Sequence, residues 1–355
     1  MTRTSESPTR ILIRLPNWVG DIMLALPAIH SLRVACPESQ LVGMARPEHV
    51  ELAQRIGALD EVLPAPPSAG VDRYRATLSV PGSLRHANLD AAVLLAPSFE
   101  AALTVWLAGI PLRVGHGTDH RAALLNRVVE VQDCHRSDGF QDLVSEFGAK
   151  PIERVDDLGL LQVEASDRAY IDRLLTTLGP PGLASPIFIN PASGKKPRAW
   201  ASDRFRHLAE HLAERYPAMS VLVHDHHPFD PPAGWPSSDS IRTVSGASLV
   251  ELAAVIERCS LYVGNDSGPM HIAAALGVPT VGIYGSSSPD RTSPHGVWRA
   301  VHLSVSASFA CSPCRERFFE DCPSLPSSDE RPPCLNEVSV KMVTAAVDRI
   351  LESRS

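Results

Sequence analysis

The strongest chemical signal in the sequence is the stretch VGNDSGPMHIAAALG, residues 263–277. An apolar run leads into a tight turn of small and polar residues, and a helix rich in alanine is predicted after it. The N–H groups that open this helix can bind an anion together with the Ser267 hydroxyl, and Gly268 lets a ligand approach the backbone closely. His271 follows about one turn later and is expected to face the same ligand. The structural alternative is that Asp266 or Ser267 caps the helix and that His271 is a core residue.

A second candidate anion site is the basic loop NPASGKKPRAW, residues 190–200, which follows another apolar run. Lys195, Lys196 and Arg198 stand there beside small residues. Open α/β sheets bind anionic ligands at the carboxyl ends of their strands, where this loop is predicted to lie. A solvated basic loop would have the same composition. The loop lacks Walker A spacing, and the chain has no G-x-G-x-x-G, which argues against a dinucleotide-dependent dehydrogenase.

One carboxylate, Asp21, lies in LIRLPNWVGDIMLALPAIHSL, residues 12–32, where a buried strand is predicted to run into a helix. Parallel-sheet proteins often place a glycine-rich phosphate loop at such a joint. A carboxylate would repel a phosphate, so this joint must serve another purpose. Asp21 is either an acid or base with a chemical task, or a cap on the helix that follows.

A further polar cluster lies in the stretch at 94–126. Arg113, His116, His120 and Arg121 gather in what the sequence predicts to be a glycine-containing loop. Such a loop can bind a phosphorylated or carboxylated substrate. A surface loop with scattered charge is the structural alternative.

An irregular excursion rich in Cys, Pro and Ser is predicted at 305–335, and it holds four of the seven cysteines. They are Cys311, Cys314, Cys322 and Cys334. Four thiolates can hold a structural zinc ion, and such a site is expected to be closed and remote from the chemistry. The later spacings, with seven and eleven intervening residues, are loose. Thiols without a metal or an oxidation-sensitive loop are the alternatives.

Composition places the chain among globular proteins. It has 355 residues, of which 44% are hydrophobic and 21% charged, and a formal charge of −7. This charge gives no general attraction to nucleic acid. No apolar run approaches the roughly 18 residues that a membrane span needs. The first ten residues lack the apolar core of a signal peptide, and lone cysteines elsewhere fit a reducing compartment, so a cytoplasmic location is expected.

Short apolar runs alternate with amphipathic stretches along the chain, which is the rhythm of a doubly wound α/β fold with parallel strands. The runs are ILIRL (11–15), LVGMA (41–45), AAVLLA (91–96), PIFIN (186–190), SVLVHD (220–225), SLYVGN (260–265) and TVGIYG (280–285).

Two domains of similar size, with a cleft between them, are predicted. The Gly- and Pro-rich stretch at 178–186 suggests a boundary, which gives domains 1–178 and 179–335. The last segment, 336–355, recovers helical spacing.

Three stretches resemble the heptosyltransferase family that builds the inner core of lipopolysaccharide, glycosyltransferase family 9. They are ILIRLPNWVGDIMLALPAIHSLR (11–33), SFEAALTVWLAGIPLRVGHG (98–117) and NDSGPMHIAAALGVPTVGIYGSSSPDRTSP (265–294). The Trp before Val-Gly-Asp is most similar to the heptosyltransferase II branch. A CSPC with trailing cysteines also occurs in this family, and the resemblance covers nearly the whole chain.

This resemblance implies a GT-B architecture, in which two Rossmann-like domains face a cleft and the last helix crosses back to the N-terminal domain. The N-terminal domain would bind the acceptor and the C-terminal domain the nucleotide sugar. The implied reaction is inverting transfer of heptose from ADP-heptose to a lipid A-linked core saccharide, with no metal or other cofactor required for catalysis. Peripheral contact with the inner face of the cytoplasmic membrane would suit such an acceptor.

The resemblance also implies roles for single residues. Asp21 matches the catalytic base. The nucleotide-sugar residues would be Asp266, Ser267, Gly268 and His271, together with Arg198, which stands where the family usually has Lys, or Lys196. The acceptor side would use Ser98, Arg113 and Arg121.

The stretch LVHDHHPFDPP, 222–232, departs from the family pattern. His and Asp stand there in place of a glycine-rich loop, so Asp225 or Asp230 would have to help hold the nucleoside. The alternatives are a family member that uses another nucleotide sugar, a binding protein without catalysis, and a sugar-nucleotide epimerase on a similar fold.

Overall fold

The computed structural model describes residues 8–67, 79–152, 159–177, 184–225, 235, 238, 240–294, 302–307, 311–314, 322 and 331–353. The chain forms two compact units, Met1–Gln162 (unit 1) and Val163–Ser355 (unit 2). This division precedes the predicted boundary at 178. The reason is helix α6 (Ala165–Thr177), which packs against α8 (Leu249–Glu257) of unit 2. The Arg168 guanidinium donates two hydrogen bonds of 2.8 Å to the Glu257 carboxylate.

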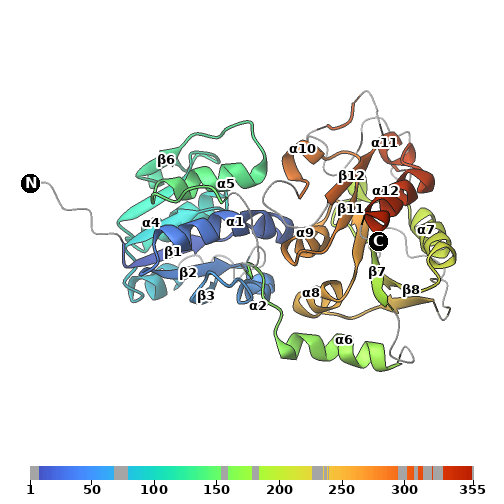
Figure 1. Ribbon diagram of the computed structural model, residues 1–355. Helices are drawn as coiled ribbons and strands as arrows, with labels where there is room; N and C mark the ends of the chain where they lie inside the picture. Colours follow the sequence, from blue (N-terminus) through green and yellow to red (C-terminus); the bar gives the residue numbers. More distant parts are fainter. Residues whose placement is uncertain are drawn as a thin grey trace, which may run out of the picture. The chain divides into compact units, whose positions relative to one another are not determined.

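Unit 1 is built on a parallel sheet of order β3-β2-β1-β4-β5-β6 (Figure 1). Its strands are β1 (Arg10–Arg14), β2 (Gln40–Ala45), β3 (Glu61–Pro64), β4 (Ala91–Leu94), β5 (Leu112–His116) and β6 (Arg127–Val129). Its described helices are α1 (Val19–Ala35), η1 (Pro47–His49), α2 (Val50–Ala53), α4 (Phe99–Leu107), η2 (Ala122–Leu124) and α5 (Arg136–Ser145).

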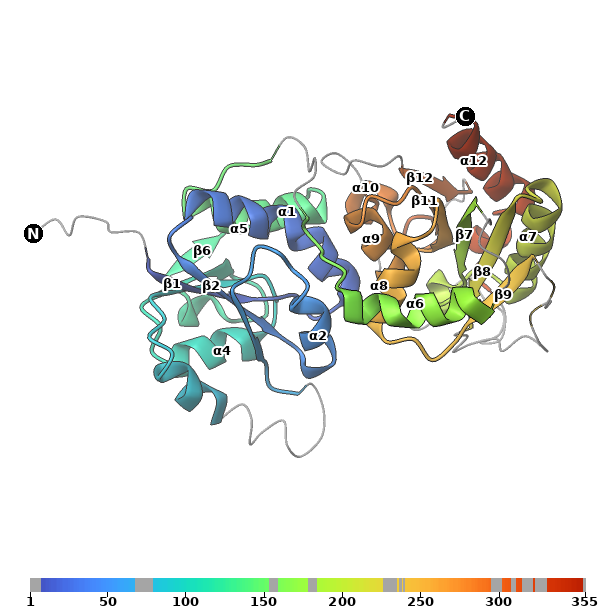
Figure 2. The same cartoon turned by 60° about the horizontal axis from the view of Figure 1, so that its bottom comes forward.

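Helices cover both faces of this sheet. Helices α1 and α5 pack together, and α4 lies on the opposite face (Figure 2). Leu12, Ala92 and Leu94 form one core cluster with α4, while their strand neighbours such as Ile13 point the other way and are equally buried. Strands buried on both faces explain the uninterrupted apolar runs in the sequence.

Unit 2 repeats the topology, with order β12-β11-β10-β7-β8-β9 and parallel pairing throughout. Its strands are β7 (Ala184–Asn190), β8 (Met219–His224), β9 (Ile241–Val244), β10 (Leu261–Asn265), β11 (Thr280–Tyr284) and β12 (His302–Ser306). Besides α6 and α8, its described helices are η3 (Lys196–Arg198), α7 (Ser202–Arg215), α9 (Gly268–Ala275), α10 (Pro289–Thr292), α11 (Pro333–Asn336) and α12 (Val340–Glu352).

The last helix, α12, belongs to the core of unit 2. It contacts α7, β11 and β12, and its buried Val343, Val347 and Ile350 join the cluster that α7 forms on the sheet. The apolar face of α12 is thus covered within unit 2, and the crossing of the last helix to the N-terminal domain stays a prediction.

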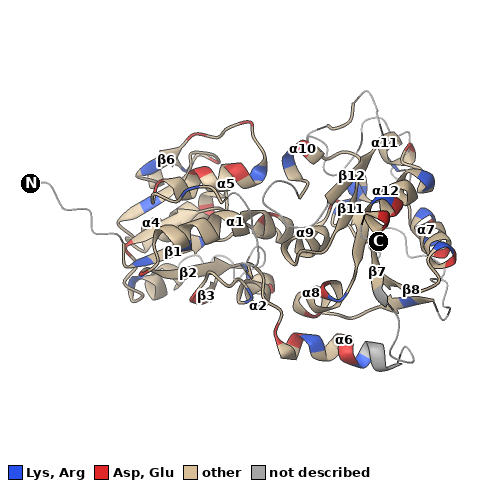
Figure 3. Ribbon diagram, in the orientation of Figure 1, with Lys and Arg blue, Asp and Glu red and all other residues tan. Residues whose placement is uncertain are grey.

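The seven predicted strands are all present, and the doubly wound α/β class is confirmed. The predicted loop around Arg113 and His116 is wrong, since both residues lie on strand β5. Charged residues gather on outer helices such as α6 and α7, whereas β10 and β11 carry none (Figure 3). No helix in the described part of the chain combines the length and apolarity that crossing a bilayer requires.

Trp200 anchors the segment that leads into α7, and its truncation should destabilise unit 2. The indole is 1% exposed, packs edge-on against Phe205 with ring centroids 4.9 Å apart, and donates to the Val338 carbonyl at 2.9 Å. We expect Trp200→Ala to lower the free energy of unfolding by about 3–5 kcal/mol, measured by urea denaturation. Trp106→Ala is the control, because that indole is 48% exposed and its loss should cost less than about 1 kcal/mol. Equal losses in the two variants would contradict this assignment.

Candidate active site

The strand order fixes where a ligand site should lie in each unit. In a doubly wound sheet, ligands bind beyond the carboxyl ends of the strands, at the point where the strand order reverses. In unit 2 this point lies between β7 and β10, which end at Asn190 and Asn265. The residues that the sequence singled out follow directly after these two ends.

The two asparagines are fully buried and tie the two loops together. The Asn265 side chain accepts from the main-chain N–H of Trp200 at 2.9 Å and donates to the Pro191 carbonyl at 2.8 Å, so it holds both ends of the basic loop. Asn190 donates to the Ser267 hydroxyl at 3.2 Å. The sequence prediction missed both roles, although each asparagine ends an apolar run and is thus marked as a strand-end polar residue.

Asn190 also connects the site to the end of β8. Its amide oxygen lies 2.8 Å from His224 Nδ1, and its amide nitrogen donates to the Tyr262 hydroxyl at 2.8 Å. The neighbouring Asp225 is exposed and donates its N–H to the Val244 carbonyl. Asp230, the other candidate for holding a nucleoside, lies outside the described residues.

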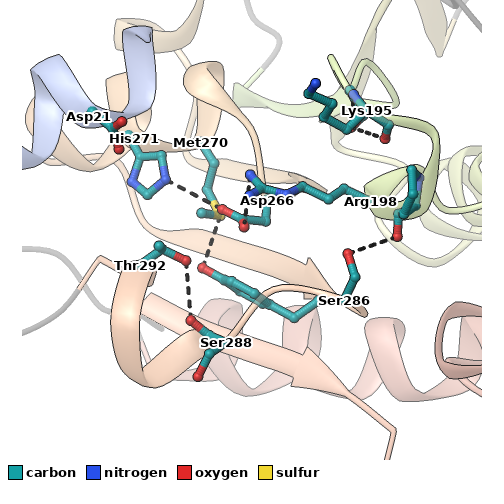
Figure 4. Close-up of polar contacts among 12 residues, drawn as sticks. Asp21, Lys195, Arg198, Asp266, Met270, His271, Ser286, Ser288 and Thr292 are labelled. Atoms are coloured by element: carbon teal, nitrogen blue, oxygen red, sulfur yellow. Dashed lines mark hydrogen bonds and ion pairs between the residues drawn. The ribbon is translucent and has the colours of Figure 1, made fainter. Parts of the chain in front are cut away.

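Asp266 is the electrostatic centre of the unit 2 site (Figure 4). Its side chain is 3% exposed, with Oδ2 at 3.6 Å from an Arg198 guanidinium nitrogen and Oδ1 at 3.5 Å from His271 Nε2. Burial acts to raise the pKa of the Asp266 carboxyl, but His271 and Arg198 outweigh burial, and the net effect is a lowered pKa. The structure brings these three predicted site residues together, a contact that the sequence did not predict.

The buried ring nitrogen His271 Nδ1, beside Asp266, has no hydrogen-bond partner among the described residues. Asp266 Oδ2 accepts no hydrogen bond either, although it is ion-paired with Arg198 at 3.6 Å. Buried polar groups are normally satisfied, and unpaired ones mark places where a ligand or water completes the bonding. The structural alternative required His271 to be a core residue with all its hydrogen bonds satisfied, and the unpaired Nδ1 argues against that alternative.

The start of α9 has few main-chain donors to offer, because Pro269 has no N–H and the Met270 N–H donates to the Ser267 carbonyl at 3.1 Å. Ser267 occupies the N-cap position, but its side chain makes no capping hydrogen bond, and Asp266 does not cap the helix either. The capping alternative is thus wrong for both residues. Gly268 is the first helical residue, and the half-buried Lys196 and Arg198 lie on η3 of the adjoining loop. The positive end of the helix dipole beside cationic side chains is suited to a phosphate.

Asp21 lies in the first turn of α1 and makes an ion pair that the sequence did not predict. The Arg136 guanidinium, at the start of α5, donates to the two carboxylate oxygens at 2.8 and 3.0 Å. Trp18 is the N-cap residue of α1, and no side chain caps the helix, so the prediction that Asp21 is a cap is wrong. The Asp21 side chain is 19% exposed and can accept a proton from a bound molecule.

The loop before α1 is held by a buried arginine. Arg14 ends β1, is 2% exposed, and donates to the Leu15 carbonyl at 2.6 Å and to the Asn17 side chain at 2.9 Å. Burial lowers the pKa of Arg14 to about 10, so it stays charged at neutral pH. The exposed Trp18 stacks with Arg46, whose guanidinium carbon lies 5.9 Å from the ring centroid.

The three predicted acceptor residues make local contacts within unit 1. Ser98 caps α4, and its hydroxyl accepts from the Ala101 N–H. Arg113 donates to main-chain carbonyls of η2 and of the turn before β5. Arg121 is fully buried, donates to the His116 carbonyl at 2.8 Å, and has its pKa lowered to about 10 by burial. Their contacts hold loops in place, and acceptor binding by these residues stays a prediction.

The four late cysteines line a single cavity. They are Cys311, Cys314, Cys322 and Cys334. Pro197 and Ser286 line the same cavity, so the cysteines adjoin the loops of the unit 2 site instead of being remote from it as expected.

Comparison with known proteins defines the class first by fold. The chain is similar to a solved structure of E. coli ADP-heptose LPS heptosyltransferase II, with a TM-score of 0.76 and 22% identity over 98% of this chain and 100% of the other. The architecture is that of the two-domain GT-B heptosyltransferase structures, as the resemblance implied.

Sequence comparison then defines the family. Residues 77–320 match the sequence model of glycosyltransferase family 9 (heptosyltransferase). Lipopolysaccharide heptosyltransferase 2 of Escherichia coli (strain K12) is 28% identical over 302 residues, which cover 80% of this chain and 85% of that protein. Its counterpart in Salmonella typhimurium (strain LT2) is 29% identical over 307 residues, with the same coverage. The chain belongs to glycosyltransferase family 9 and is a glycosyltransferase.

The pH dependence of stability tests the electrostatics of Asp266. A lowered pKa means that the carboxylate stabilises the fold above its ordinary value of 3.8, and that this contribution is lost as pH falls through the value in the fold. We expect Asp266→Asn to reduce the free energy of unfolding by about 1–3 kcal/mol at pH 7, because Arg198 loses its partner in a buried setting. The difference from wild type should shrink below about pH 4.

The matched control is Asp203→Asn, in the exposed first turn of α7. Urea denaturation at several pH values measures all three proteins. A difference between wild type and Asp266→Asn that stays constant down to pH 3 would show that the Asp266 charge does not stabilise the fold.

Proposed function

We propose that this chain transfers heptose from ADP-heptose to the lipid A-linked inner core of lipopolysaccharide, with inversion at the anomeric carbon and without a catalytic metal. The observation that carries the proposal is the buried Asp266, which Arg198 and His271 flank beside unpaired polar atoms at the strand-order reversal of unit 2. Membership of the family and the activities named for the two relatives support it.

The donor side is argued from charge. The diphosphate of a nucleotide sugar gains negative charge as its bond to the sugar breaks, and fixed donors stabilise that charge best. The cations of η3 and the Gly268 N–H, at the positive end of the α9 dipole, would supply these donors. Asp266 would fix the positions of Arg198 and His271 before the ligand arrives, so that little reorganisation is needed.

The acceptor side needs a base. An acceptor hydroxyl oxygen would attack the anomeric carbon, the bond from that carbon to the diphosphate oxygen would break, and ADP would leave. The hydroxyl proton would pass to the Asp21 carboxylate. Arg136 would orient this carboxylate through its paired hydrogen bonds and would leave one face of each oxygen open to the acceptor.

The chain would act in the cytoplasm at the inner face of the membrane, because a lipid-linked acceptor is held there. Contact would be peripheral, through basic side chains and anionic lipid. The exposed aromatic residues Trp18, Phe99 and Trp106 of unit 1 offer surface for an amphiphilic acceptor.

A donor screen tests the substrate. We expect ADP-heptose to raise the melting temperature more than UDP- or GDP-sugars do, with about 2.7 kcal/mol of added stability at 100 times its Kd. His271→Ala should weaken this effect, since it removes a group that faces the diphosphate. A preference for UDP- or GDP-sugars would reject ADP-heptose as donor. Binding without transfer to any core acceptor would indicate a binding protein, and product from donor alone would indicate an epimerase.

Replacement of the base tests the mechanism. We expect Asp21→Asn to lower kcat by about 10²–10⁴-fold while the Kd for ADP-heptose stays unchanged, because the amide cannot take the proton. Asp60→Asn is the matched control, since Asp60 also pairs with an arginine of unit 1, Arg33, on a surface without an assigned function. Transfer by Asp21→Asn near the wild-type rate would show that another group is the base.

A further inference from the structure

Four cysteines of the segment 311–334 line one small cavity in unit 2. The cavity has a volume of about 30 Å³, and Cys311, Cys314, Cys322 and Cys334 line it together with Pro197, Ser286, Ser312 and Pro332. Cys334 is buried, Cys314 and Cys322 are partly buried, and Cys311 is exposed. Side chains buried to such different extents are not a simple core packing set.

The cavity wall is held by hydrogen bonds to the loop that follows β11. The Cys314 N–H donates to the Ser286 carbonyl at 3.1 Å, and the Cys314 Sγ lies 3.4 Å from the same oxygen. The Ser312 hydroxyl donates to the Gly285 carbonyl at 2.5 Å. These bonds fix the CSPC turn against the end of β11.

Glycine at position 285 is what allows Cys334 to approach this loop. A Cβ at Gly285 would lie 2.5 Å from the Leu335 side chain and 3.3 Å from the Cys334 Sγ. Neither contact leaves room for a larger residue unless α11 moves. The chain thus has a close approach that brings the last cysteine to the other three.

The chemistry of the lining selects the ligand. Among the residues that the structure describes, four cysteines and no charged side chain line the cavity, and four thiolates suit a thiophilic metal ion such as Zn²⁺ in tetrahedral geometry. A volume of about 30 Å³ holds one ion. No disulfide links any of the seven cysteines, all of which lie in the described part of the chain.

We propose that Cys311, Cys314, Cys322 and Cys334 bind one thiophilic metal ion, zinc or iron, as a structural four-thiolate site. The thiols lose their protons to solvent as the ion binds, and no electron is transferred. Among the described residues, no three potential ligands are yet gathered closely enough to hold an ion, so binding draws the cavity wall inward. The proposal does not depend on the reaction that the chain catalyses.

The position of the proposed metal site indicates which loops a bound ion would stabilise. The Ser286 hydroxyl donates to the Pro197 carbonyl at 3.1 Å, next to Arg198, and Ser287 follows in the same loop. A bound ion would cross-link the CSPC turn, Cys322 and the start of α11, and the hydrogen bonds of Ser312 and Cys314 would pass this constraint to the loop after β11. It would thereby brace two of the loops that form the unit 2 site.

Metal analysis of the full-length protein, purified under reducing conditions, tests the proposal directly. We expect about one equivalent of zinc or iron per chain, and loss of most of it in Cys314→Ser and Cys322→Ser. Cys134→Ser is the control, because Cys134 lies in unit 1, and it should keep the full equivalent. Less than about 0.1 equivalent in the wild type, with no uptake of added Zn²⁺, would overturn the proposal.

A second measurement uses only the wild type, in case the variants do not fold. After chelation, added Zn²⁺ should protect four thiols from an alkylating reagent, and it should slow amide hydrogen exchange at 285–288. Cobalt in place of zinc should give the absorption bands of a tetrahedral thiolate site. Alkylation that is the same with and without Zn²⁺ would overturn the proposal.

Discussion

The site of unit 2 depends on two buried amides that cross-connect two strand ends. Asn190 ends β7 and holds Ser267 in the loop after β10, while Asn265 ends β10 and holds Pro191 and Trp200 in the loop after β7. Each strand end therefore determines the position of the loop that follows the other strand. Both side chains have to be buried for this, and a buried amide is tolerated only when it is hydrogen-bonded. Here the main chain supplies those bonds for Asn265, and the side chains of Ser267, Tyr262 and His224 supply them for Asn190.

The hydrogen bonds of Asn265 hold the basic loop in place, and this loop compensates the charge of a buried carboxylate next to Asn265. Asp266 follows Asn265 directly and is 3% exposed. Taking a carboxylate out of water is costly unless cations compensate, and Arg198 reaches it from the very loop that Asn265 fastens. The lowered pKa of Asp266 shows that compensation outweighs burial. The unpaired ring nitrogen of His271 then stands in a fixed position with unused hydrogen-bonding capacity, which is what recognition of a polar ligand requires.

Much of the fold could be predicted because central parallel strands are buried on both faces. ILIRL, PIFIN and TVGIYG appear as plain apolar runs for this reason. The outer strands were missed, since an edge strand has little to bury: β6 reads RVV and is mostly exposed. Strand β5 was taken for a loop because its sequence LRVGH contains arginine, glycine and histidine. Local pattern carries no signal for a strand whose polar side chains are satisfied by carbonyls of a neighbouring turn.

The candidate site shows the same difference between residues that local sequence reveals and residues that only the packing brings together. Asp266, Ser267 and His271 lie within one turn and could be selected from local chemistry, whereas the Asp21–Arg136 pair joins residues that are far apart in sequence and requires the packing of α1 on α5. Arginine was the hardest residue to interpret. Arg14, Arg113 and Arg121 all donate to main-chain carbonyls, and a guanidinium with five donors is as useful for holding a loop as for holding a phosphate.

The strand order alone does not determine the surroundings of the carboxylate in either unit. Both have the same order and the same reversal point, yet unit 1 places an accessible carboxylate after its first strand and unit 2 places a buried, compensated one after its fourth. In unit 1, one arginine pairs with the carboxylate and leaves it partly exposed, which suits a group that exchanges protons. In unit 2, an arginine and a histidine flank the carboxylate from two directions, which suits a group that orients its neighbours. The surroundings of the two carboxylates therefore depend on which residues follow the strand ends, and a fold built twice can place a partly exposed acid in one copy and a buried, compensated acid in the other.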